Sequence, residues 1–104
     1  MRYRVADHGR VFSTRDRGAQ IFSDFSAFSA HASGGTDVVL DFADVLSMTP
    51  SFADEFIGEL LVRSARGEIV MPALENLAPA PLRSVERCAR ARGVDCSSPH
   101  LAVA

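Results

Sequence analysis

The sequence contains no lysine and no tryptophan, and the first absence excludes several functions. All eleven basic residues are arginine, which excludes Schiff-base chemistry and the lysine of a phosphate-binding P-loop. No apolar run approaches the roughly 20 residues that a membrane-spanning helix needs. The start, MRYRVADHGR, lacks the apolar core of a signal peptide. We therefore expect a cytoplasmic protein without a membrane partner.

Cysteines and net charge are also scarce. Cys88 and Cys96 do not form a CxxC motif, so reduced, unpaired thiols are expected. The formal net charge is −2, which gives no electrostatic reason to expect a nucleic-acid partner. The sequence has no GxSxG, HExxH, Walker or GxGxxG pattern. We therefore expect a non-enzymatic protein without a metal or a cofactor.

The composition is that of a globular domain. Of the 104 residues, 47% are hydrophobic and 23% are charged, which fits one small folded unit. The last residues show little patterning. We therefore expect a single domain over residues 1–96, followed by a tail over residues 97–104.

Hydrophobic periodicity predicts strands and helices in alternation. Apolar stripes at helical spacing predict three helices, which fall in the segments 13–35, 51–66 and 79–93. Runs of β-forming residues predict strands, which fall at residues 2–6, 10–12, 36–42 and 67–77. The first two are expected to form a hairpin or one bent edge segment.

This order predicts an α/β fold with a mostly parallel or mixed sheet of about four strands and three helices. Helices that follow parallel strands begin at the carboxyl edge of the sheet, where ligand sites are common. Arg15, the turn 49–51 and Asn76 should therefore gather there, beside Asp41.

One stretch of the sequence resembles a known family. VVLDFADV followed by SMTPSFADEFIGELL resembles the STAS-like domains of uncharacterised function found in bacterial proteins, whose hallmark is an Asp-Phe strand end and a Ser-Phe-Ala-Asp-Glu helix start. STRDRGAQIF and ALENLAP agree with the same family, so the resemblance covers roughly residues 9–92. It implies a STAS-like fold.

More distantly, the layout is similar to the STAS domains of anti-sigma-factor antagonists. Those domains bind a histidine-kinase-like anti-sigma factor and are switched by phosphorylation of a serine in an Asp-Ser-Ser-Gly turn. A gapless match places Pro50 at the accepting position and Phe52 in place of the glycine. Thr49 or Ser51 could then accept the phosphate.

Two positions have both a structural and a functional interpretation. Ser51 could cap a helix together with Asp54, or it could be the phosphorylated residue. Asp41, inside an apolar strand, could bind a ligand. It could instead accept hydrogen bonds from the turn before Ser51, or from Arg15.

The leading hypothesis is a regulatory domain that docks a histidine-kinase-like ATPase or another anti-sigma factor. Its docking residues would be Thr49, Pro50, Ser51, Asp54 and Glu55. The alternative is a small-ligand or nucleotide-binding domain that uses the carboxyl edge, with Arg15, Asp41 and Asn76 as candidate anion or ligand contacts. A homodimer through that edge or through the first strand is a third possibility.

Overall fold

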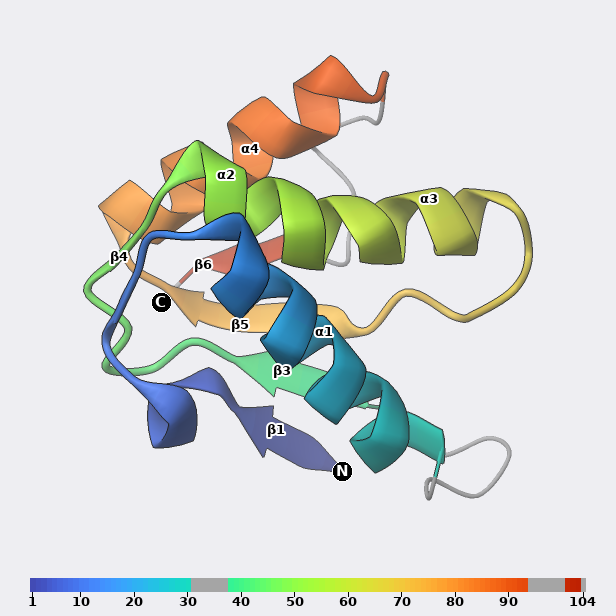
Figure 1. The fold of residues 1–104 in the computed structure, drawn as a ribbon, viewed down its shortest axis with the longest axis horizontal. Coiled ribbons are helices and arrows are strands. Elements are labelled where there is room, and N and C mark those ends of the chain that lie inside the picture. Colours follow the sequence, from blue (N-terminus) through green and yellow to red (C-terminus); the bar gives the residue numbers. More distant parts are fainter. Residues whose placement is uncertain (31–37, 94–100, 104) are drawn as a thin grey trace.

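The backbone forms two parallel sheets in a computed structural model, which describes residues 1–30, 38–93 and 101–103 (Figure 1). The main sheet has four strands in the order β1-β3-β5-β6, which span Arg2–Arg4, Val39–Asp41, Ala73–Leu77 and Leu101–Val103. A two-stranded sheet pairs β2 (Val11–Phe12) with β4 (Ser47–Met48). The predicted mixed α/β fold with parallel strands is confirmed.

Parallel pairing brings three side chains to one edge of the main sheet. Arg4 lies opposite Asp41, and Asp41 lies opposite Glu75 in the next strand. These residues are close to the carboxyl ends of their strands, so polar groups gather at the carboxyl edge.

The first two predicted strands form as β1 and β2, but the prediction that they make a hairpin or one bent edge segment is wrong, because they lie in different sheets. A short 3₁₀ helix, Val5–His8, follows β1, and the chain then turns at Gly9 with a φ of 141°. Val5 is completely buried, so the turn packs into the core instead of folding β2 back onto β1. β1 pairs with β3, and β2 pairs with β4.

Three helical segments pack against the sheets. They are α1 (Arg15–Ala30), a continuous helix over residues 50–65, and α4 (Pro79–Ala91). The continuous helix consists of α2 (Pro50–Ala53), a π-helical turn (Asp54–Gly58) and α3 (Glu59–Ala65), and we call it α2–α3. Thr14 caps α1, because its hydroxyl oxygen accepts a hydrogen bond from the Arg17 amide at 3.1 Å. The predicted stop of this helix at residues 34–35 lies outside the described residues.

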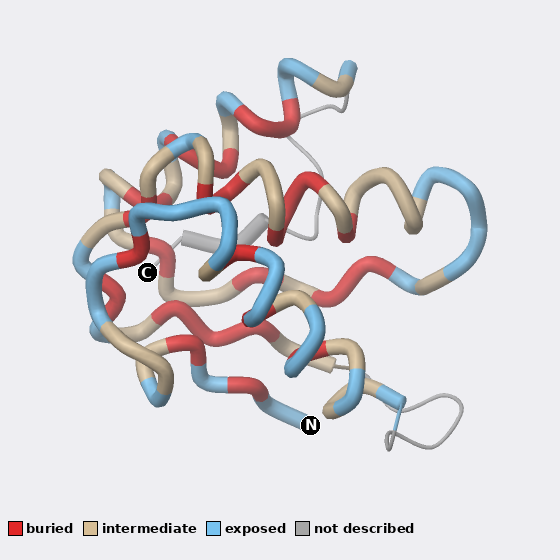
Figure 2. Tube along the Cα trace, viewed as in Figure 1, coloured by how far each residue is buried: buried red, intermediate tan, exposed pale blue. Residues whose placement is uncertain are grey.

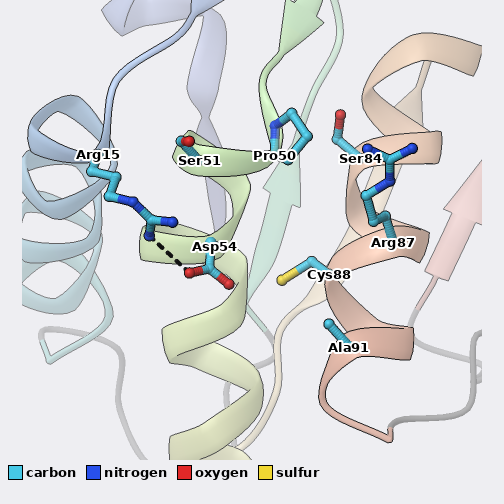
Figure 3. Close-up of a pocket in the computed structure, with 8 residues that line it drawn as sticks. All are labelled: Arg15, Pro50, Ser51, Asp54, Ser84, Arg87, Cys88 and Ala91. Carbon is cyan, nitrogen blue, oxygen red and sulfur yellow. Dashed lines mark hydrogen bonds and ion pairs between the residues drawn. The ribbon is translucent and has the colours of Figure 1, made fainter.

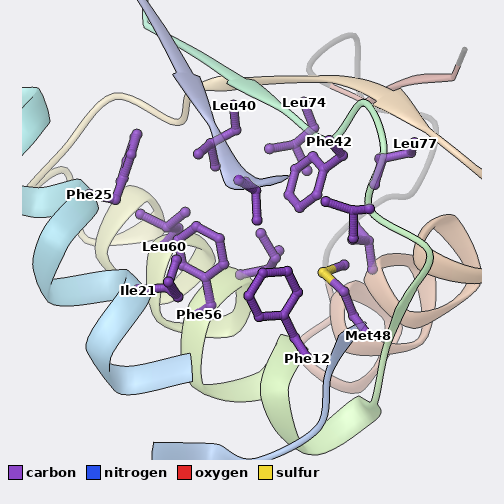
Figure 4. Close-up of a cluster of buried hydrophobic side chains, with 14 of the residues drawn as sticks. Phe12, Ile21, Phe25, Leu40, Phe42, Met48, Phe56, Leu60, Leu74 and Leu77 are labelled. Atoms are coloured by element: carbon purple, nitrogen blue, oxygen red, sulfur yellow. The ribbon is translucent and has the colours of Figure 1, made fainter. Parts of the chain in front are cut away.

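The core lies between the strands and the helices (Figures 2 and 4). Leu40 and Leu74 from the sheet face Phe56 and Leu60 from α2–α3, and all four are at most 2% exposed. Burying such a side chain contributes roughly 1.5–3 kcal/mol each. The core therefore fixes α2–α3 against the sheet.

A glycine permits the close crossing of α1 and α2–α3. A Cβ atom at Gly18 would lie 2.8 Å from the Phe52 carbonyl oxygen and 2.8 Å from Glu55 Cβ, which is closer than side chains pack. The crossing places the first turn of α1 beside the first turns of α2–α3. Arg15 therefore comes within reach of the acidic residues of α2–α3.

The C-terminal residues differ from the expected tail. Leu101–Val103 form β6, a strand at the edge of the main sheet that pairs in parallel with β5. An irregularity in the register between Leu74 and Leu77 interrupts this pairing. Three residues are too few for a period-2 pattern to stand out in the sequence.

Candidate docking surface at the start of α2–α3

Thr49 caps α2–α3. Its backbone is extended (φ −74°, ψ 159°), and its hydroxyl oxygen accepts a hydrogen bond from the Phe52 amide at 3.2 Å. The same hydroxyl donates to the Ser13 carbonyl oxygen at 3.0 Å. Pro50 follows as the first helical residue, where its fixed φ suits the helix and its missing N–H is not needed. The prediction that Ser51 is the cap is therefore wrong.

Ser51 is left with a free hydroxyl. It is half-buried in the first turn, and its side chain makes no hydrogen bond to any other residue in the described part of the chain. Pro50 beside it is exposed. Figure 3 shows Ser51 between Arg15 and Pro50 at one side of a pocket.

This pocket lies between three helices. It is shallow, with a volume of about 240 Å³. Its lining includes Arg15 from α1, Pro50, Ser51 and Asp54 from α2–α3, and Ser84, Arg87 and Cys88 from α4. Ser84 and Cys88 also bond to neighbouring elements, Ser84 to β4 and Cys88 to α2–α3. The Ser84 hydroxyl donates to the Met48 carbonyl oxygen at 2.6 Å, and the Cys88 thiol to that of Ala53 at 3.7 Å.

Two arginines clamp Asp54. Arg15 Nη1 lies 2.8 Å from one carboxylate oxygen, and Arg92 Nη2 lies 2.6 Å from the other. The hydrogen bonds from Arg15 and then Arg92 hold the pKa of Asp54 below its usual value, against a smaller opposing effect of burial. Asp54 therefore ties the start of α1 and the end of α4 to α2–α3.

Glu55 shares the same arginine. Its Oε1 lies 3.1 Å from Arg15 Nη1, the atom that also binds Asp54. Adjacent carboxylates on a regular helix point about 100° apart, yet the long side chain of Arg15 reaches both. Asp54 and Glu55, two of the predicted docking residues, are thus both paired with an arginine of the same chain.

Asp41 lies in a separate polar network. It is 6% exposed, and its Oδ1 accepts hydrogen bonds from Asn76 Nδ2 and from the Ala43 amide, both at 2.9 Å. Arg2 Nη1 lies 3.1 Å from its other oxygen. Burial alone would raise the pKa of Asp41, but these hydrogen bonds and the guanidinium outweigh it, so the pKa is lowered. The structural interpretation of Asp41 is confirmed in part. Asp41 accepts a hydrogen bond from a backbone amide, as expected, but the arginine that pairs with it is Arg2 and not Arg15.

The three candidate ligand contacts fall into two groups. Asn76, in the left-handed region with a φ of 62°, donates to Asp41. Arg15 is held by Asp54 and Glu55, and no hydrogen bond or ion pair among the described residues joins it to Asp41 or Asn76. The carboxyl edge thus offers no single anion site built from these three residues.

A family model matches residues 18–69, which are 52 of the 104 residues. Its description is a STAS-like domain of unknown function (DUF4325). The chain belongs to this family. No curated protein and no solved structure matches the chain significantly. The matched part of this STAS-like domain contains Ser51, Asp54 and Glu55, but it contains neither Arg15 nor α4.

The sequence reasoning missed Arg2 and Arg92 in this STAS-like domain. Arg2 could have been found only from the parallel register of β1 and β3. Arg92 follows the last turn of α4 and reaches back over Gly58, where a Cβ atom would lie 2.4 Å from the guanidinium carbon. The glycine in the π turn was the available signal, because it leaves room for a long side chain.

The described part of this STAS-like domain lacks a metal-binding cluster and a membrane-spanning helix. In residues 1–30, 38–93 and 101–103, no group of three or more His, Cys, Asp or Glu side chains is placed to hold a metal ion. Within the same ranges, no helix has both the length and the hydropathy needed to cross a bilayer.

Proposed function

We propose that this STAS-like domain is a non-enzymatic regulatory module that docks another protein through the start of α2–α3. The partner is a histidine-kinase-like ATPase or another anti-sigma factor, and phosphorylation of Ser51 switches the docking. The observation that carries the proposal is the free Ser51 hydroxyl beside the exposed Pro50, at the mouth of a shallow pocket.

The side-chain contacts favour Ser51 over Thr49 as the phosphate acceptor. The Thr49 hydroxyl is engaged both as acceptor and as donor, so its modification would remove a helix cap worth about 0.5–2 kcal/mol. A phosphate on Ser51 would add a charge of about −1.5 to −2 without breaking an intramolecular hydrogen bond. Arg15 and Arg87 line the same pocket and would attract it.

The pocket chemistry supports binding over catalysis. Among the described residues, those that line the Ser51 pocket include no histidine that could act as a base. Asp54 is the only carboxylate among them; Arg15 and Arg92 lower its pKa, and burial raises the pKa of the Cys88 thiol. The described lining therefore offers neither a strong base nor a thiolate nucleophile.

The test combines phosphorylation with binding. The purified domain is incubated with ATP and each histidine-kinase-like ATPase of its source genome, and the mass and position of any phosphate are measured. We expect one phosphate on Ser51. By titration calorimetry, Ser51→Asp should weaken the complex at least tenfold, and Pro50→Ala should weaken it less.

Ser23→Asp provides a matched control, because Ser23 is exposed on α1 and lies outside the docking surface. It should bind as the wild type does. If no ATPase binds, or if Ser51→Asp and Ser23→Asp bind equally well, the docking surface is wrongly placed. A phosphate found only on Thr49 would refute Ser51 as the switch.

A further inference from the structure

Beside the Ser51 pocket lies a second hollow that carries positive charge. Its volume is about 310 Å³, and it shares Pro50, Ser84 and Arg87 with the Ser51 pocket. Arg83 and Arg90 complete its charged lining, together with Ala80. We call this second hollow the arginine groove.

The three arginines of the groove have no side-chain partner in the part of the chain that the structure describes. Arg83, Arg87 and Arg90 are exposed, and their side chains make no hydrogen bond or ion pair with any other residue that the structure describes. They follow one another at i, i+4 and i+7 on α4, so they form a stripe about 10 Å long. The opposite face of α4 holds Val85 and Ala89 in the interior, which fixes the stripe outward.

Among the described residues, the nearby acidic side chains do not neutralise this stripe. Asp54 lies in the adjoining pocket, but Arg15 and Arg92 already hold both of its oxygens. Glu86 on α4 is half-buried and is engaged in a contact of its own. The groove is therefore a local excess of positive charge on a chain whose formal net charge is −2.

We propose that the arginine groove binds an acidic peptide segment of the partner protein, with two or three carboxylates spaced over about 10 Å. This inference rests on the proposed docking function and names the chemistry of the partner segment. The arginine fork suits carboxylates, since each guanidinium can donate two parallel hydrogen bonds to one of them.

The dimensions favour a peptide over a polyanion. Proteins that bind duplex DNA commonly neutralise about 6–10 phosphates, whereas this stripe offers three charges. The negative net charge of the chain would repel an extended polyanion or an anionic lipid surface. A short acidic segment would contact the three arginines and remain away from the negatively charged parts of the chain.

The test uses a fluorescein-labelled pentapeptide with glutamate at its first, third and fifth positions, and a matched peptide with glutamine instead. Fluorescence anisotropy is measured at about 50 mM salt, where screening is modest. We expect saturable binding of the glutamate peptide alone. The double variant Arg83→Gln/Arg87→Gln should weaken it at least tenfold.

The matched control, Arg10→Gln/Arg66→Gln, removes the same charge from exposed arginines outside the groove. It should change the affinity less than twofold, and thermal melting should show both double variants folded. Equal losses in the two double variants would overturn the proposal, as would the absence of saturable binding.

Other occupants give distinguishable results. Tighter binding of a single-stranded oligonucleotide or of phosphatidylserine vesicles than of the peptide would overturn the proposal. A salt-sensitive dimer that Arg83→Gln/Arg87→Gln dissociates would also overturn it, in favour of a second copy. Because the titration uses no ATPase and keeps Ser51, its failure would refute the groove and leave the proposed docking at Ser51 standing.

Discussion

Asp41 and Asp54 are both carboxylates held by arginine, but their surroundings differ. Asp41 is buried at the sheet edge and accepts from an amide side chain, a backbone amide and Arg2. Asp54 is about one-third exposed and is held by two arginines from other helices. The first network is closed and maintains the fold, whereas the second borders an open pocket and positions helix ends. The contrast indicates which of the two polar regions is available to a partner.

Removing the buried carboxylate should have the largest effect. Asp41→Ala leaves Asn76 and the Ala43 amide without their acceptor, and we expect a loss of about 2–4 kcal/mol in the free energy of unfolding. Urea denaturation measures it. The double variant Asp41→Ala/Asn76→Ala should cost less than the sum of the two single changes. Strict additivity would contradict a shared network.

Adding a methyl group at the crossing of α1 and α2–α3 should have the second-largest effect on the free energy of unfolding. In Gly18→Ala the new methyl group meets the Phe52 carbonyl oxygen, and we expect a loss of about 1–3 kcal/mol by thermal or urea unfolding. Ala19→Ser, at the neighbouring exposed position of α1, is the control and should be nearly neutral. A neutral Gly18→Ala would show that α1 moves away from α2–α3 without cost.

Breaking the exposed clamp should have a smaller effect. Asp54→Asn weakens two ion pairs that water and salt already screen, so we expect a loss of about 1 kcal/mol or less. Its stability relative to wild type should improve with salt, while that of Asp41→Asn should change little. The two salt series therefore test the contrast directly. Equal salt dependence of the two variants would contradict the difference between the buried Asp41 network and the exposed Asp54 clamp.

The loss of stability at acid pH should show the smallest difference between the variants and the wild type. Both carboxyls have a folded-state pKa below the ordinary value of 3.8, so each contributes stability that is present above that pH. Each contribution is lost as the pH falls below 3.8 through the folded pKa. Urea midpoints from pH 6 to pH 2 should thus fall less steeply for Asp41→Asn and Asp54→Asn than for wild type. A wild-type slope in both variants would contradict the lowered pKa values.

Local sequence patterns predicted most of the helices and the parallel order, because these depend on spacing within the chain. The predicted segments 13–35 and 79–93 contain α1 and α4, and the apolar stripe of α4 includes Val85 and Ala89, which are buried. The position of the second helix start was predicted within two residues. The capping residue was not, because Pro50 moves the extended cap position back to Thr49.

The unpredicted features all depend on contacts between distant segments. The arrangement of β1 and β2 follows from a buried Val5, which the sequence alone does not place in a 3₁₀ turn. Arg2 meets Asp41 only through strand pairing, and Arg92 meets Asp54 only through the packing of α4. The Ser51 hydroxyl is free among the described residues whereas that of Thr49 is bonded, a distinction that needed the hydrogen bonds of Thr49.

The π turn in α2–α3 leaves the register of that helix intact. The residues that flank the turn, Ala53 and Glu59, have right-handed helical dihedrals. Phe52, Phe56 and Leu60, which lie before, within and after the turn, are all at most 2% exposed. The same face of the helix therefore meets the core along its length, and one inserted or deleted residue within the turn would rotate α3 by about 100° and turn Leu60 away from the sheet. The position of Ser51 and the burial of Leu60 thus depend on one helical register.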